Sequence, residues 1–270
     1  MRTHHILGRV RIGLFLVVIV PVTLALIPVQ WLALRVQAPY AARLPMLYHR
    51  FAARLMGLRV RVSGVPLNAG PRLFLCNHSS WLDIIALGSV MPLSFVARAD
   101  VADWPIFGLF AKLQRTVFVD RTRKMATKQA RDALAGRLQH KEAIVLFAEG
   151  TTSDGNRVLS FRSALIGAVS GSLEEPDTAL QPVAMAYRRR SGLPLMRHER
   201  PAIAWYGDME LIPHFGGVLK GGPIEVEICF GPPLTAEHKA DRKAATHYAE
   251  RQIRVAVATL LRGRDRPDWQ

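Results

Sequence analysis

The chain has 270 residues, half of them apolar, which allows one sizeable hydrophobic core and excludes a mainly disordered or low-complexity protein. Lys and Arg outnumber Asp and Glu by 36 to 21, and the formal net charge of +15 indicates anionic partners: nucleic acid, anionic lipid surfaces or phosphorylated substrates. The two cysteines, Cys76 and Cys229, lie in separate apolar runs, so we expect no disulfide framework and no cysteine-rich metal site.

The N-terminal region is predicted to associate with a membrane. Residues 12–34 are almost uncharged, are long enough to cross a bilayer, and lack the small-residue cleavage site of a removed signal peptide. Pro21 and Pro28 interrupt this stretch, and basic residues flank it on both sides, which favours the cytoplasmic side for both flanks. A broken hairpin in the inner leaflet and one full span are therefore both consistent with the sequence. Either one predicts the inner (cytoplasmic) membrane, with the rest of the chain on the cytoplasmic side.

Residues 40–58 are predicted to form a basic amphipathic helix. Apolar side chains recur there at helical spacing, at Leu44, Leu47, Phe51, Leu55 and Leu58. Such a helix suits an anionic membrane surface, and an ordinary core-packing helix fits the pattern equally well. We place the main boundary at its end, with membrane-associated helices over residues 1–58 and an α/β domain over residues 59–270.

The remaining chain alternates between strand and helix patterns. Strands are predicted at residues 59–62, 73–76, 94–97, 116–119, 143–147, 180–186, 202–205 and 224–230. Helices are predicted at residues 82–89, 104–113, 124–140, 163–172, 212–219 and 236–261. This alternation predicts an α/β fold with a mixed, largely parallel sheet flanked by helices, in which ligands collect beyond the carboxyl ends of the strands.

One such strand end carries the strongest chemical signal. The predicted strand 73–76 is followed by His78, and Asp83 comes five positions later in the first turn of a predicted helix. Histidine is well suited to take a proton from an alcohol near neutral pH, and a bend between the two residues would let Asp83 face back toward it. The plainer interpretation is a helix start, since Ser80 and Asp83 also have the spacing of a capping box.

Two further strands end in polar residues. The segment after residue 147 contains Glu149 and a Gly-Thr-Thr-Ser run at residues 150–153, whose hydroxyl and amide groups can cradle an anion. Glu149 is predicted to be buried and to orient a basic partner or a substrate hydroxyl. The strand 116–119 is followed by Asp120 and Arg121, and Arg121 is a candidate for a forked grip on phosphate or for a surface ion pair.

Other chemistries have less support in the sequence. We find no phosphate-binding Gly-x-x-x-x-Gly-Lys loop, no dinucleotide fingerprint, no His-Glu-x-x-His zinc helix and no Gly-x-Ser-x-Gly elbow. Aromatic residues lie within apolar runs rather than among the basic residues, so no nucleic-acid partner is expected. Strand alternation puts Cys76 on the same side as His78, so a thiol nucleophile is an open alternative to inert packing.

These motifs resemble those of the glycerolipid acyltransferase family, which includes 1-acylglycerol-3-phosphate acyltransferases. The Asn-His-x-x-x-x-Asp motif of that family is similar to residues 77–83. Its Pro-x-x-Gly segment leading to a strand that ends in Asp-Arg is similar to residues 104–121. Its Phe-Pro-Glu-Gly-Thr-Arg-Ser motif resembles residues 147–153, and its apolar strand with a proline resembles residues 181–184. The order and spacing agree over about residues 60–190.

Two positions depart from the family pattern. Ala148 stands where the family has proline, and Thr152 stands where it often has an arginine associated with the glycerol-phosphate headgroup. Arg121, Arg157 or Arg162 is then expected to supply the positive charge. The form of residues 147–155 looks like bacterial branches that include lyso-ornithine lipid acyltransferases.

The resemblance implies a membrane-bound O-acyltransferase that moves a fatty acyl group from acyl-carrier protein or coenzyme A to the free hydroxyl of a lysolipid. The expected acceptor is 1-acyl-sn-glycerol-3-phosphate, which gives phosphatidic acid, and lyso-ornithine lipid is the alternative acceptor. We expect His78 to act as general base and Asp83 to orient it, with no metal and no cofactor besides the acyl donor. The acceptor headgroup is expected to contact Arg121, Glu149, Gly150, Thr151, Thr152 and Ser153. A non-catalytic lipid-binding protein with the same fold is the alternative from a different class.

Overall fold

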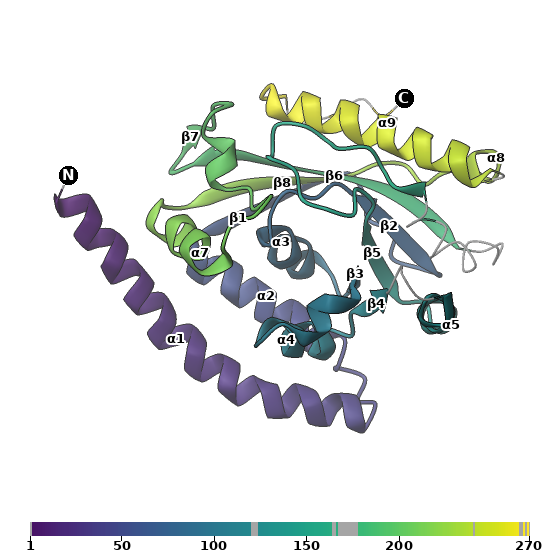
Figure 1. Ribbon diagram of the computed structural model, residues 1–270, viewed down its shortest axis with the longest axis horizontal. Helices are drawn as coiled ribbons and strands as arrows, with labels where there is room; N and C mark the ends of the chain where they lie inside the picture. Colours follow the sequence, from purple (N-terminus) through teal and green to yellow (C-terminus); the bar gives the residue numbers. More distant parts are fainter. Residues whose placement is uncertain are drawn as a thin grey trace.

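A computed structural model describes residues 2–119, 124–163, 166, 178–239, 241–264, 267 and 269. It consists of one mixed sheet with helices on both faces and a long N-terminal helix along one side (Figure 1). The predicted α/β class is confirmed.

The sheet has the strand order β1-β8-β6-β2-β5-β3-β4, and β7 pairs with β6. All pairs are parallel except β6 with β8 and β6 with β7, which are antiparallel. The strands are β1 (Leu58–Ser63), β2 (Arg72–Cys76), β3 (Ser94–Arg98), β4 (Val117–Val119), β5 (Ala143–Phe147), β6 (Ala179–Arg190), β7 (Leu193–Pro194) and β8 (Ile224–Phe230). In the centre, Cys76 at the end of β2 pairs with Phe147 on β5 and Val183 on β6.

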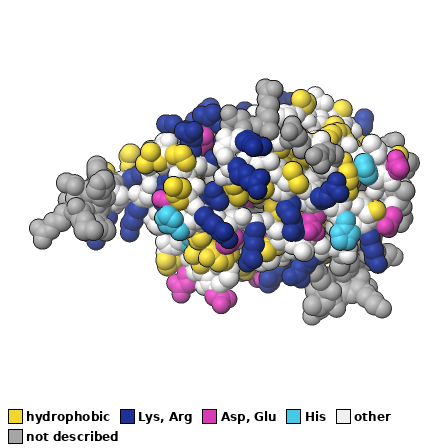
Figure 2. Space-filling view, turned by 90° about the horizontal axis from the view of Figure 1, so that it is seen from above, with side chains coloured by type: hydrophobic (Ala, Val, Ile, Leu, Met, Phe, Trp, Pro, Cys, Tyr) yellow, Lys and Arg dark blue, Asp and Glu magenta, His cyan; other side chains and the backbone are white. Residues whose placement is uncertain are grey.

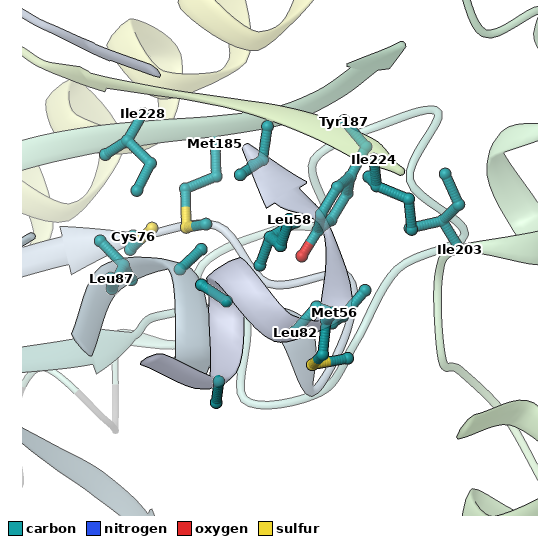
Figure 3. Packing of buried hydrophobic residues seen from close by; sticks show 14 of the residues in the cluster. Met56, Leu58, Cys76, Leu82, Leu87, Met185, Tyr187, Ile203, Ile224 and Ile228 are labelled. Carbon is teal, nitrogen blue, oxygen red and sulfur yellow. The ribbon is translucent and has the colours of Figure 1, made fainter. Parts of the chain in front are cut away.

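Alternation along β2 divides the core into two layers. Leu73 and Leu75 pack with buried residues of α5 (Lys124–Gln139) and α9 (Arg242–Leu261). Phe74 and Cys76 pack on the other face with α2 (Arg43–Met56), α3 (Leu82–Val90) and α7 (Leu211–Lys220). Figure 3 shows this second layer, in which side chains of the sheet meet those of the helices beneath it. The shorter helices are η1 (Ala99–Asp103), α4 (Phe107–Leu113), η2 (Arg200–Ala202) and α8 (Ala236–Lys239).

The N-terminal helix α1 (Arg2–Arg35) is continuous, so the break expected at the prolines is absent. Pro21 and Pro28 are exposed and lie seven residues apart, which puts both on the same outer side of the helix. Proline weakens backbone hydrogen bonding on its own side, so two such positions bend α1 in the same direction, toward the domain (Figure 1).

The inner side of α1 packs on the domain, and its outer side is apolar and exposed. Phe15 and Ile19 are buried against the layer formed by α2 and α7, and the buried Gln30 donates to the carbonyls of Ala41 and Leu113 at 3.0 and 2.9 Å. The segment Gly8–Arg35 is the only helical stretch of the described chain that is long and apolar enough to cross a membrane. Its exposed apolar side chains include Val10, Leu14, Val17, Leu24, Trp31 and Leu32.

Three predicted elements differ from the structure. The predicted strand 202–205 is wrong: the buried Ile203 and Ala204 follow η2 and cover the loop after β2 instead of joining the sheet. The predicted helix 236–261 is two helices, because Asp241 caps α9 by accepting from the backbone N–H groups of residues 243 and 244. The helix predicted at residues 104–113 begins at Phe107, and most of the helix predicted at residues 163–172 lies outside the described residues.

Candidate active site

The candidate site lies at the carboxyl end of β2, where Asn77 anchors the chain to β6. Its side chain donates to the carbonyl of Met185 at 3.0 Å and accepts from the backbone N–H of Met185 at 2.8 Å. This pair continues the β2–β6 ladder by one residue after the strand has ended. The turn into α3 therefore starts from a fixed point.

His78 and Asp83 are joined by a hydrogen bond. His78 Nδ1 lies 2.8 Å from Asp83 Oδ2, and the same oxygen accepts from the backbone N–H groups of Ser79 and Ser80 at 2.7 and 3.0 Å. The turn between the two residues thus brings their side chains together, which a separation of five positions within one continuous helix would not do. Asp83 also accepts from the backbone N–H of Ser80, as the last residue of a capping box does, but Trp81, which directly precedes α3, makes no side-chain cap. Asp83 is fully buried, while 17% of the His78 side chain is exposed.

Tyr187 completes the group around Asp83, and the sequence analysis missed it. Its hydroxyl donates to Asp83 Oδ1 at 2.5 Å from β6, and Figure 3 shows the hydroxyl directed away from the sheet. Burial and then the charge of Asp83 raise the pKa of Tyr187, so the phenol stays protonated and remains a donor. Asp83 therefore receives hydrogen bonds from two backbone amides, one phenol and one imidazole.

Glu149 holds the loop beside His78. Its Oε1 accepts from the backbone N–H of His78 at 2.9 Å, and its Oε2 accepts from that of Leu159 at 3.0 Å. The side chain is buried, and burial raises the pKa of Glu149 to about 8. The predicted burial is confirmed, and both carboxylate oxygens already have backbone partners.

The residues after Glu149 form a tight loop close to the histidine. Gly150 has φ +69°, a conformation that favours glycine, and the backbone N–H of Ser153 donates to the carbonyl of His78 at 2.9 Å. Ser153 is buried, Thr152 is half-buried and Thr151 is exposed. The structure thus brings the loop 150–153 next to His78. Arg121, the sixth residue expected to contact the headgroup, lies outside the described residues.

An aromatic side chain covers one face of the histidine ring. The His78 ring stacks on Phe147 with centroids 3.8 Å apart, and Phe147 stacks on Phe95. The backbone N–H of Trp205 donates to the carbonyl of Ser79 at 2.8 Å. With Nδ1 bonded to Asp83 and the ring face against Phe147, His78 Nε2 is the nitrogen available to a substrate.

The alternative nucleophile Cys76 is unsuited to that task. It is fully buried, and burial, followed by the charges of Asp83 and Glu149, raises the pKa of its thiol well above the usual value. A thiol must ionise to act as a strong nucleophile, so this environment favours inert packing. Within the described residues, no group of three or more His, Cys, Asp or Glu side chains is arranged to hold a metal ion.

The fold and the site define an α/β protein with a paired histidine and aspartate at the end of a central strand. Residues 59–186 match the Acyltransferase family. The chain is 44% identical to a lyso-ornithine lipid O-acyltransferase from Brucella abortus, over 97% of this chain and 99% of that protein. It is 42% identical to a lyso-ornithine lipid O-acyltransferase from Rhizobium meliloti, over 95% of this chain and 89% of that protein. It is 30% identical to a 1-acyl-sn-glycerol-3-phosphate acyltransferase from Neisseria gonorrhoeae, over 77% of each chain.

A solved structure supports the fold. The crystal structure of a 1-acyl-sn-glycerophosphate acyltransferase from Thermotoga maritima superposes with a TM-score of 0.62 at 18% identity, covering 94% of this chain and 97% of that one. The chain belongs to the acyltransferase family, and it is an enzyme that transfers acyl groups. The resemblance found in the motifs is confirmed.

Proposed function

We propose that the enzyme transfers a fatty acyl group from a thioester donor to the free hydroxyl of lyso-ornithine lipid. The observation that carries this acceptor is the 44% identity, over nearly the whole of both chains, to a protein named for that reaction. Thr152 supports the proposal, because the arginine associated with a glycerol-phosphate headgroup is missing there. The acceptor expected first, 1-acyl-sn-glycerol-3-phosphate, is now the second candidate, supported by the relatives at 30% identity.

In the proposed mechanism, His78 is the general base. Its Nδ1–H donates to Asp83, so Nε2 carries the free lone pair and takes the proton from the acceptor hydroxyl. The hydroxyl oxygen forms a bond to the thioester carbonyl carbon, and the carbon–sulfur bond then breaks. The thiolate leaves with the proton from Nε2. Asp83 holds the imidazole in the required tautomer and stabilises its protonated form, as the acid does in a catalytic triad.

We infer that the enzyme lies on the cytoplasmic leaflet of the inner membrane. The bent α1, with its inner side packed on the domain and its outer side apolar, suits a helix lying in one leaflet better than a straight span. The opposite face carries α9, and Figure 2 shows many Lys and Arg side chains on it. A cationic face away from the lipid suits an anionic donor, either acyl-carrier protein or coenzyme A.

A panel of acceptors tests the proposed substrate. Detergent-solubilised enzyme would receive labelled acyl-carrier protein or acyl-coenzyme A, together with lyso-ornithine lipid, 1-acyl-sn-glycerol-3-phosphate or other lysophospholipids. We expect kcat/KM to be highest for lyso-ornithine lipid. A higher kcat/KM for 1-acyl-sn-glycerol-3-phosphate would overturn the proposed acceptor and leave the acyl-transfer class intact.

A further inference from the structure

A cavity of about 170 Å³ lies at the end of the sheet opposite His78. It is bounded by the first residues of three strands, Arg72 on β2, Ser94 on β3 and Ala143 on β5. At about 3.3 Å per residue, the length of β2 separates it from the candidate active site by more than ~13 Å. It is therefore distinct from the acyl-transfer site.

Cations converge on this cavity. Arg72, Arg115 and Lys141 line it, and the only carboxylate of a described residue in its wall is Glu142, which pairs with Arg115. Arg137 lies close behind, near enough for its charge to interact with those of Glu142 and Arg115. Even if each helix end near the cavity contributes about half a negative charge, roughly two positive charges remain uncompensated.

Two of these cations occupy positions that usually carry glycine. Arg115 follows α4 with φ +62°, and Lys141 follows α5 with φ +59°. After α4, the backbone N–H groups of Arg115 and Thr116 donate back to the helix, to the carbonyls of Lys112 and Ala111 respectively. After α5, the backbone N–H groups of Lys141 and Glu142 donate in the same way to the carbonyls of Leu138 and Arg137. A side chain is disfavoured in this conformation, so two cations directed at one cavity indicate a use for their charge.

Two half-buried arginines beside the cavity each have one buried nitrogen without a hydrogen-bond partner. Arg72 donates from Nη1 to the carbonyl of Gly70, but its Nε has no partner, and neither does Nη1 of Arg137. Burial lowers the pKa of both residues. An anion in the cavity would face Arg72, Arg115 and Lys141, the cations that line it, and would offset their charge.

We propose that this cavity binds a phosphate group, supplied by the headgroup of an anionic phospholipid. The remaining wall includes Ala41 and Ala42 from the connection between α1 and α2, and Pro45 from the first turn of α2. The exposed apolar residues Val36 and Tyr40 lie in the same connection, which continues from the apolar side of α1. The cavity therefore lies where the protein meets the lipid surface. A volume equal to several waters of ~30 Å³ accommodates a phosphate group.

Thermal unfolding of the full-length enzyme in a neutral detergent tests this proposal. The probes are short-chain phosphatidylglycerol, short-chain phosphatidylcholine and inorganic phosphate. We expect phosphatidylglycerol to raise Tm by about 3–6 °C at saturation, and phosphatidylcholine to raise it less. Arg72→Gln should weaken this binding about 10- to 100-fold, whereas Arg59→Gln, the same change at an exposed strand start, should leave it unchanged.

Lys141→Gly separates binding from folding. Glycine relaxes the left-handed backbone, so this variant should have a ligand-free Tm about 2 °C higher than wild type and a smaller shift with phosphatidylglycerol. An equal Tm shift with inorganic phosphate, competing at the same site, would support the anion site and overturn the lipid as its source. Identical phosphatidylglycerol titrations of Arg72→Gln, Arg59→Gln and wild type would overturn the site itself.

Discussion

At the scale of single residues, the site is organised around Asp83 rather than around the histidine. One buried carboxylate receives four hydrogen bonds, and the donors come from the turn after β2 and from β6. A carboxylate held in this way cannot rotate away from His78 without leaving several donors unpaired. The sequence indicated the pair itself but not Tyr187, because that contact depends on how β6 is placed relative to α3.

Tyr187→Phe is expected to shift the pH dependence of acyl transfer. Without the hydrogen bond from the phenol, the negative charge of Asp83 is less offset, so it stabilises protonated His78 more strongly. The loss of kcat/KM should then be largest at low pH, with activity recovering at high pH. Tyr48→Phe is the matched control, because it removes a hydroxyl that is bonded to Thr23 on α1 rather than to Asp83. A uniform loss of activity at all pH values would contradict this role.

Glu149 is expected to make stability depend on pH. Its pKa of about 8 lies above the ordinary value of 4.5, so the folded enzyme keeps a proton that the unfolded chain releases between these values. The free energy of unfolding should therefore fall as pH rises through this window, by roughly 1 kcal/mol per pH unit. Glu149→Gln should flatten this slope in denaturant titrations at several pH values, whereas the exposed Glu237→Gln should keep it.

At the scale of elements, the parts predicted best were those with a strong local signal. The buried strands of the sheet centre and the helices α2, α3 and α7 lie close to where their apolar patterns placed them. Residues 202–205 show where such patterns fail: the run is apolar because it is buried, but Ser80 Oγ donates to the carbonyl of Ile203, which lies against the loop after β2. Burial alone cannot distinguish a strand from a buried loop.

The break between α8 and α9 gives a prediction about stability. Asp241 caps the 20-residue helix that covers one face of the sheet, and Asp241→Ala leaves those backbone N–H groups without this acceptor. We expect a loss of about 1 kcal/mol, or roughly 2–4 °C in Tm, with kcat little changed. Asp208→Ala, at an exposed loop position, serves as the control for the loss of a negative charge. Equal Tm values for the two variants would contradict the capping role.

At the scale of the whole molecule, the bent helix α1 and the cationic face of α9 lie on opposite sides of the sheet (Figure 1). One side suits lipid, the other an anionic donor in water, and His78 lies at the end of the strand between them. The composition indicated anionic partners but could not separate these two sides, because their arrangement depends on the folded sheet.

The central claim is that His78 is the base of acyl transfer. The most direct test is the single-turnover rate of labelled acyl transfer to lyso-ornithine lipid by His78→Ala, compared with His198→Ala at an exposed histidine. We predict that His78→Ala lowers this rate at least about a hundredfold while its Tm equals that of the wild type, and that His198→Ala leaves the rate unchanged. A folded His78→Ala enzyme with a near-normal rate would contradict the mechanism.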